Sequence, residues 1–246
     1  MRMVLVGGAL LAPLLAAADA SETASRLDAL HAQRQDAERL KELEALTADA
    51  VKSYPNDGEI LWRAARLKYW QCDGANDDEA RRAFGKEAWD YGERAVQAAP
   101  QAVAAHYYAA IGLGCYAQAV GILQAIAQGL EGRFNQRVDQ ALKMDASYEH
   151  AGPLIAKGRY YFELPWPRRD LRRSAEMLEK AVSLQPASLR AYFYLAETQL
   201  RDGAPKKARE TLSRVFEGGV GYDVAEGRRI KAWAPRLKAE IDKELK

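Results

Sequence analysis

Apolar and polar residues along most of this chain recur with the period of an α-helix. After residue 20, apolar residues fall mostly at helical spacing, at Leu27, Leu30, Leu40, Leu43, Leu46 and Ala50. No segment alternates apolar and polar residues at period two for long enough to form a strand. The pattern predicts an all-α fold with helices over 21–52, 59–71, 151–164, 168–184, 189–201, 206–216 and 225–246, and with one more beginning near residue 78.

Four successive segments end in a similar phrase. The phrases close at Pro55, Pro100, Asp145 and Pro186, at intervals of 45, 45 and 41 residues. A helix end that recurs at a near-constant period is typical of stacked helix hairpins. It predicts one repeat domain with units over about 21–56, 57–100, 101–145, 146–186 and 187–218, capped by the helix at 225–246. Such stacks are mainly binding surfaces, so the repeat favours a binding role.

The stretch from Val96 to Leu130 contains no Asp, Glu, Lys or Arg. One interpretation is a membrane-spanning segment. His106, Pro100 and several Gln and Gly residues argue against it, because polar groups are costly inside a bilayer. We favour a helix pair that is buried on nearly all sides or that faces a partner. Within it, Gly112 is expected to permit close helix packing.

The first twenty residues have the layout of a secretory signal peptide. A positive start is followed by a small apolar run, and small residues offer cleavage sites near Ala18 or Ala20. The run is short for a transmembrane helix, which needs about 20 apolar residues. We therefore expect an exported, periplasmic chain with no transmembrane span after cleavage. An uncleaved anchor is the alternative.

The composition argues against a nucleic-acid partner and leaves open whether the two cysteines form a disulfide. The 246 residues carry 36 Lys and Arg against 34 Asp and Glu, a net charge of +2, which does not indicate nucleic-acid binding. Cys72 and Cys115 fall at nearly equivalent places near the ends of successive first helices. In an oxidising compartment they could form a disulfide, and two separately buried thiols are the alternative.

The repeat residues resemble tetratricopeptide repeats. These repeats have a bulky residue, then a Leu followed by a small residue, in the first helix, and small and bulky apolar residues in the second helix. The last unit follows this order with Tyr192, Leu195, Ala196, Gly203, Ala208, Leu212 and Val215. The spacing exceeds the 34-residue repeat, which indicates insertions at the turns. The phrases around Trp62, His106 and Trp166 narrow the resemblance to an extended-repeat subgroup that includes regulator-of-microtubule-dynamics proteins. The layout is also similar to the exported T component of TRAP-type transporters. The resemblance implies a right-handed solenoid of antiparallel hairpins.

Candidate binding residues lie on the first helix of each hairpin, which lines the concave face of such solenoids. They are the large amphipathic or charged residues Trp62, Arg66, Tyr69, Trp70, His106, Tyr107, Arg159, Phe162, Arg190, Tyr194 and Glu197. For the aromatic residues, packing within a repeat is the alternative. For Arg159, Arg190 and Glu197 it is a solvated face or an internal ion pair. Catalytic and metal-binding motifs are absent from the sequence, so we expect no enzyme activity, no cofactor and no metal.

Two functions follow from these patterns. The first is a scaffold whose groove holds a protein or peptide partner, with arginines reaching carboxylates or carbonyl oxygens. The second is a transport-associated component that relays a small apolar solute to transporter subunits. In that case the charge-free stretch would line a pocket or a homo-oligomer surface. The sequence favours the scaffold.

Overall fold

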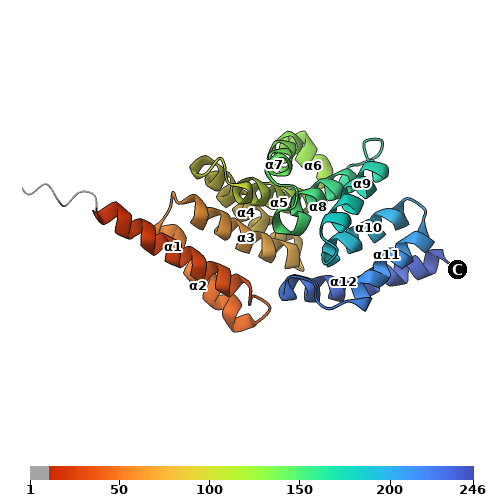
Figure 1. Cartoon of the computed structure of the whole chain (residues 1–246). Coiled ribbons are helices and arrows are strands. Elements are labelled where there is room, and N and C mark those ends of the chain that lie inside the picture. Colours follow the sequence, from red (N-terminus) through yellow and green to blue (C-terminus); the bar gives the residue numbers. More distant parts are fainter. Residues whose placement is uncertain (1–10) are drawn as a thin grey trace, which may run out of the picture.

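The computed structural model describes residues 11–246, and helices account for nearly all of them (Figure 1). The helices are α1 (Leu11–His31), α2 (Ala37–Ser53), α3 (Gly58–Gly74), α4 (Asp78–Ala98), α5 (Val103–Val120), α6 (Ile122–Ala127), α7 (Leu130–Met144), α8 (Tyr148–Glu163), α9 (Leu171–Leu184), α10 (Leu189–Arg201), α11 (Pro205–Glu217) and α12 (Val224–Glu244). No strand occurs over that range. The predicted all-α class is confirmed.

Helix boundaries follow from local chemistry. At the start of α2, α3, α4, α9 and α12 an aspartate side chain accepts a hydrogen bond from a backbone N–H of the first turn. Each such N-cap stabilises its helix by about 1 kcal/mol. Pro55, Pro100 and Pro186 directly follow the C-cap residues of α2, α4 and α9. The recurring phrase of the sequence is therefore a recurring helix end.

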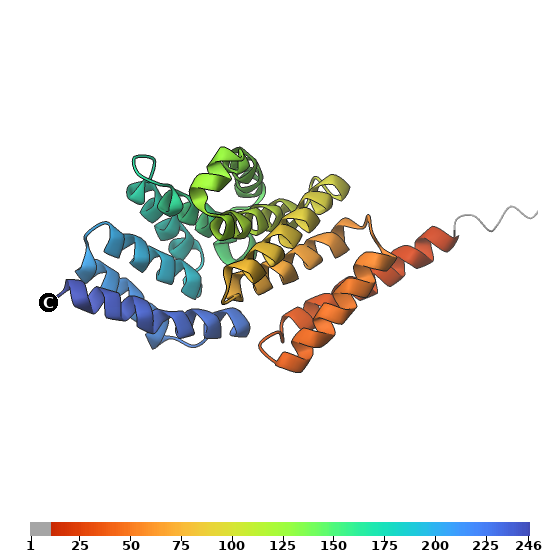
Figure 2. The same ribbon diagram turned by 180° about the vertical axis from the view of Figure 1, so that it is seen from behind.

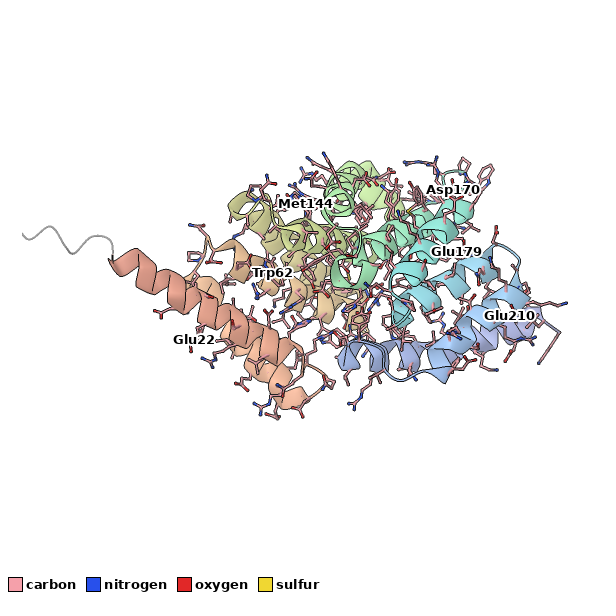
Figure 3. All side chains as sticks on the ribbon, viewed as in Figure 1. Glu22, Trp62, Met144, Asp170, Glu179 and Glu210 are labelled. Atoms are coloured by element: carbon pink, nitrogen blue, oxygen red, sulfur yellow. A yellow bond between two sulfur atoms is a disulfide. The ribbon has the colours of Figure 1, made fainter. Side chains whose placement is uncertain are left out.

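Consecutive helices pair into hairpins, and the hairpins stack side by side. The pairs are α1–α2, α3–α4, α5–α7, α8–α9 and α10–α11, with α12 packed on α10 and α11. Helices α3, α5, α8 and α10 contact one another in sequence order and form the inner face of the array. Charged residues such as Glu22, Glu179 and Glu210 point away from the stack (Figure 3).

Two predicted elements differ from the structure. The helix expected over 21–52 is broken at residues 32–36, where the chain turns and Asp36 caps α2. The first unit is therefore a complete hairpin. The third unit contains an additional short helix, α6, between two glycines with positive φ, Gly121 and Gly129. A positive φ suits glycine because it lacks a Cβ.

Helix α5 spans the middle of the charge-free stretch, and it is buried along most of its length. Glycines let α4 and α5 approach closely: a Cβ on Gly92 would lie 2.4 Å from Cα of Ala109, and one on Gly112 would lie 2.8 Å from the backbone of Ala88. The predicted packing role of Gly112 fits this geometry. Among residues 11–246, no helix is long and apolar enough to cross a membrane.

The two ends of the array meet. Arg34, in the turn between α1 and α2, forms a 2.6 Å ion pair with Asp223, the N-cap of α12, although the two are 189 residues apart. Figure 2 shows, from behind, the beginning of α12 next to the turn that joins α1 and α2. The solenoid thus closes around its inner face.

The predicted signal peptide covers residues 1–20, and residues 1–10 lie outside the described part of the chain. The expected cleavage positions at Ala18 and Ala20 fall within α1. Removal of the leader stays a prediction.

Candidate functional site

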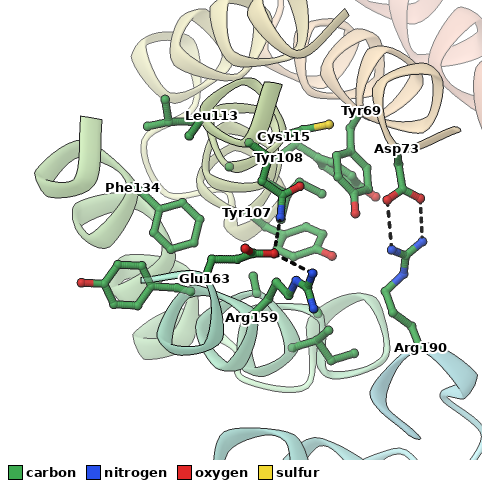
Figure 4. A pocket seen from close by; sticks show the side chains of 18 of the residues that line it. Tyr69, Asp73, Tyr107, Tyr108, Leu113, Cys115, Phe134, Arg159, Glu163 and Arg190 are labelled. Atoms are coloured by element: carbon green, nitrogen blue, oxygen red, sulfur yellow. Dashed lines mark hydrogen bonds and ion pairs between the residues drawn. The ribbon is translucent and has the colours of Figure 1, made fainter. Parts of the chain in front are cut away.

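A cavity of about 190 Å³ opens on the inner face of the array (Figure 4). Its walls come from the first helices α3, α5, α8 and α10, from α6 and α7, from the beginning of α12, and from the end of α1 with the turn that follows it. One side is apolar, with Leu113 and Phe134, and the opposite side carries Asp73 and Arg190 (Figure 4). The cavity is therefore amphipathic, as a site for a ligand with a polar and an apolar part would be.

The structure brings together most of the predicted binding residues. Seven of the eleven line the cavity: Arg66, Tyr69, Trp70, Tyr107, Arg159, Arg190 and Tyr194. They come from α3, α5, α8 and α10, which are far apart in sequence. The geometry places them at one site, and their role in binding stays a prediction.

Four predicted residues do not line the cavity. Trp62 stacks on Tyr108 with ring centroids 5.7 Å apart, inside the packing between α3 and α5. His106 is buried, with Nε2 2.9 Å from the carbonyl oxygen of Pro100. Phe162 is buried on α8, and Glu197 is occupied by an ion pair with Arg159. For these four residues the structure shows the alternatives named from the sequence, which are packing within the array and ion pairs within the chain.

The arginines expected to reach a ligand are already paired with carboxylates of the chain. Arg190 donates to both oxygens of Asp73, at 3.1 and 2.8 Å, and its Nε lies 3.3 Å from Glu226. Arg159 pairs with Glu163 at 2.6 Å and with Glu197. Of the alternatives left open by the sequence for Arg159 and Arg190, the structure has the internal ion pair.

Asp73 is the centre of an ion-pair cluster at the polar end. It lies in the last turn of α3, where it accepts hydrogen bonds from Arg190 and from Arg229 at 3.0 Å. Burial opposes its ionisation, but the two arginines outweigh burial and lower the pKa of Asp73. Arg229 also lies over the ring of Trp70, 3.1 Å from its centroid. The cluster joins α3, α10 and α12 across the cavity.

The sequence did not identify several lining residues. Asp73 was assigned to a turn, and its partner Arg190 lies 117 residues away. The apolar lining from α6 and α7 could have been found from the charge-free stretch, which includes Ile122, Ile126 and Leu130. No local signal marks the tyrosines Tyr108 and Tyr222.

Glu149 reaches the cavity through an unusual backbone conformation. Glu149, His150 and Ala151 have φ of 45°, 56° and 66°, a left-handed turn at the beginning of α8. Residues with side chains rarely adopt this conformation, which costs about 1–3 kcal/mol each. The Glu149 carboxylate accepts a hydrogen bond from the Tyr108 hydroxyl at 3.0 Å, and the His150 ring stacks on Tyr222.

Two further features concern covalent and metal chemistry. Cys72 and Cys115 are joined by a disulfide between α3 and α5, with Cα atoms 6.5 Å apart. Of the two alternatives left open by the sequence, the structure has the bridge. Across residues 11–246, no group of three or more His, Cys, Asp or Glu is arranged to hold a metal ion.

Comparison with known proteins identifies the fold and the family. A crystal structure of a thermophilic TPR protein from Thermus thermophilus superposes with a TM-score of 0.61 at 17% identity, covering 92% of this chain and 98% of that protein. This similarity shows a TPR-like fold. Regulator of microtubule dynamics protein 3 from Xenopus laevis is 25% identical over 191 residues. That match covers 76% of this chain but about 40% of the Xenopus protein. The family model for regulator of microtubule dynamics protein 1-3 matches residues 23–171, and the chain belongs to this family.

Proposed function

We propose that this chain is a non-enzymatic scaffold that holds a short segment of a partner protein in its inner cavity. The TPR-like fold indicates a protein-interaction scaffold, and the position of the cavity carries the finer proposal. It lies on the face formed by α3, α5, α8 and α10, where stacked hairpins present a concave surface. The name of the Xenopus relative refers to microtubule dynamics. We extend to this chain only the scaffold role.

The two sides of the cavity suit an amphipathic segment. Apolar side chains of the partner would pack against Leu113, Ile126 and Phe134, and this burial contributes about 25 cal/mol per Å² of apolar surface. Polar groups of the partner segment would form hydrogen bonds with the tyrosines and the charged residues on the opposite side of the cavity. Because Arg159 and Arg190 are ion-paired within the chain, recognition depends on the aromatic and apolar walls more than on free arginines.

A matched pair of substitutions on α6 tests this proposal. Ile126 lines the cavity, whereas Leu123 on the same helix is 73% exposed and does not line it. In selection of random peptides on the immobilised protein, the wild type and Leu123→Arg are expected to enrich the same peptides. Ile126→Arg is expected to enrich none of them. The proposal is wrong if the wild type enriches no peptide, or if Ile126→Arg enriches the same set.

The transport-associated role is a second candidate, favoured by the closure of the cavity. The Arg34–Asp223 pair bridges the two ends of the array, which suits a small solute better than a long segment. In this case the chain would relay an apolar solute to transporter subunits. Native mass spectrometry of the purified protein distinguishes the two roles. A bound small molecule that Ile126→Arg abolishes would support the solute role.

We further propose that the chain is exported to the periplasm. The leader-like first twenty residues and the Cys72–Cys115 disulfide support this, because disulfides persist in oxidising compartments. Cleavage near Ala18 or Ala20 would shorten α1 but leave Leu27 and Leu30, which pack in the first hairpin. Determining the N-terminus of the protein from the periplasmic fraction tests the proposal. A chain that stays in the cytoplasm would contradict export, and an exported chain that keeps Met1 would indicate the uncleaved anchor instead.

A further inference from the structure

One carboxylate in the cavity has no cationic partner. Six carboxylates and four guanidinium groups line the cavity. The five paired carboxylates are Asp73, Glu131, Glu163, Asp223 and Glu226, each bound to an arginine. Within residues 11–246, Glu149 forms no ion pair, and its one side-chain hydrogen bond comes from the Tyr108 hydroxyl. Glu149 is thus the one carboxyl group of the cavity lining without a cationic partner among the described residues.

The cations that line the cavity are not available to compensate Glu149. Arg34 is bound to Asp223, Arg66 to Asp28, and Arg159 and Arg190 to the carboxylates described above. His31 also lines the cavity, but burial and the nearby Arg66 and Arg34 hold its pKa well below the usual range. The imidazole is therefore neutral at neutral pH.

Tyrosine rings gather around this carboxylate. Tyr107 and Tyr108 lie edge to face with centroids 5.0 Å apart, and both line the cavity with Tyr222. Tyr107 is held against the start of α8, since a Cβ on Gly152 would lie 2.5 Å from its hydroxyl oxygen. Burial and the nearby Glu149 carboxylate raise the pKa of Tyr108 well above its usual value, so the phenol stays neutral. Trp62 covers one face of Tyr108 and His150 covers one face of Tyr222, which leaves the opposite face of each ring and the ring of Tyr107 for a ligand. Neutral aromatic faces attract cations through their quadrupole.

The Glu149 carboxylate and the tyrosine rings around it favour a cationic ligand. A carboxylate beside aromatic faces is the arrangement that binds organic cations, because it supplies both an ion pair and cation–π contacts. The apolar wall with Ile122, Ile126 and Leu130 continues from the same cavity and suits an alkyl chain. Glu149 is also not used to cap α8, because no backbone N–H of the described chain donates to its carboxylate.

We propose that Glu149, with the rings of Tyr107, Tyr108 and Tyr222, binds the cationic head of a Lys or Arg side chain whose alkyl part lies along the apolar wall. The inference deepens the proposed function and rests on it, since it names the anchor residue of the partner segment. A free alkylamine has the same chemistry, so the experiment includes both sources.

Isothermal titration calorimetry with four probes tests the proposal. The peptide pair is acetylated, amidated Leu-Lys-Leu and its counterpart with norleucine in place of lysine. The free pair is hexylamine and hexanol. The wild type is expected to bind the lysine peptide roughly ten-fold more tightly than the norleucine peptide, because only the lysine head forms a charge-assisted hydrogen bond with Glu149. Glu149→Gln is expected to abolish this preference.

The control variant is Glu179→Gln, an exposed carboxylate on α9 that should keep the preference. Because the wild-type comparison needs no substitution, the test does not depend on the folding of Glu149→Gln. Equal affinity for the lysine and norleucine peptides would overturn the cation site and leave the scaffold role standing. Binding of hexylamine over hexanol without binding of either peptide would support the Glu149 site for a free amine and overturn the lysine anchor, whereas the scaffold role is tested separately by the peptide selection with Ile126→Arg.

Discussion

Six tyrosines line the cavity, as many as the carboxylates, and the ionisation of their phenols is suppressed. Burial raises the pKa of Tyr69 and of Tyr107 well above the usual value, and neighbouring carboxylates and tyrosines add to the effect. A phenolate formed there would be a buried charge without a partner, which is costly. The phenols of these two tyrosines therefore stay neutral over the physiological range.

Alkaline unfolding is the consequence at the residue scale. A phenol whose pKa is raised in the folded state stabilises the fold fully below the unfolded pKa of about 10, and this stabilisation is lost as pH rises further. We expect the ultraviolet absorbance of tyrosinate to rise together with the loss of helical circular dichroism above about pH 10. Tyr69→Phe should shift this transition to higher pH. Tyrosinate formation that is complete before any helix is lost would contradict the prediction.

At the scale of elements, the close packing of α4 on α5 depends on glycine. The backbone of Ala109 occupies the position that a Cβ on Gly92 would take, and Ala88 does the same for Gly112. The disulfide joins α5 to the end of α3 on the same side of the stack. These contacts fix α5 as the central helix of the array.

A pair of Gly→Ala substitutions separates packing from helix propensity. In Gly92→Ala the new Cβ would lie 2.4 Å from Cα of Ala109, so α4 and α5 must move apart, at a cost of about 1–3 kcal/mol. The control is Gly132→Ala in α7, where no atom lies within 4 Å of the new Cβ. It should stabilise the protein by about 0.5–1 kcal/mol. Urea unfolding measures both, and equal effects of the two substitutions would contradict the packing argument.

The disulfide has its own test. Intact mass under non-reducing conditions should lie about 2 Da below the reduced mass, because the bond between Cys72 and Cys115 replaces two hydrogens. The bridge spans a sequence separation of 43, so Cys72→Ser with Cys115→Ser should lower the free energy of unfolding by about 2–4 kcal/mol. An unchanged mass on reduction would show free thiols.

At the scale of the whole molecule, polar contacts hold the two ends of the solenoid together. Arg34 is 5% exposed, pairs with Asp223 and lies over Trp70 at 4.3 Å. Arg229 and Arg190 reach Asp73 from α12 and α10. The N-terminal hairpin and α12 are thereby linked although few apolar residues join them, and the cavity lies between these contacts.

Removing one contact should loosen the closure. Breaking a buried ion pair typically costs about 3–5 kcal/mol, so Arg34→Met should expose the α1–α2 turn and the start of α12. Hydrogen exchange followed by mass spectrometry should be faster in these two regions and unchanged in α5. The control is Arg39→Met, whose side chain is 53% exposed and pairs with Glu42 on the surface. Faster exchange throughout the chain would instead indicate global destabilisation.

Because Arg190 and Arg159 are ion-paired within the chain, charge-reversing substitutions at these positions cannot serve as tests of binding. A glutamate at position 190 would face Asp73 and Glu226, and one at position 159 would face Glu163 and Glu197. Like charges in a buried site destabilise the fold. If Arg190→Glu or Arg159→Glu lost binding, the loss could therefore result from unfolding as well as from a missing contact with the ligand.

The sequence determined the secondary structure and the repeat. It predicted the all-α class, the helix at Leu189–Arg201 with its observed bounds, and the stacking of hairpins. These features depend on caps, prolines and apolar periodicity, which act within a few residues. The break near Asp36 was missed because the apolar pattern continues on both sides of it.

The tertiary structure decided the composition of the site. Arg190 was correctly placed on an inner helix, but whether it is free depends on Asp73, 117 residues earlier in the chain. Glu149 lines the cavity from a left-handed turn, a conformation that residues with side chains rarely adopt and that the sequence pattern did not predict. Ion pairs and cavities depend on the distances between helices, and those distances result from the packing of the whole array.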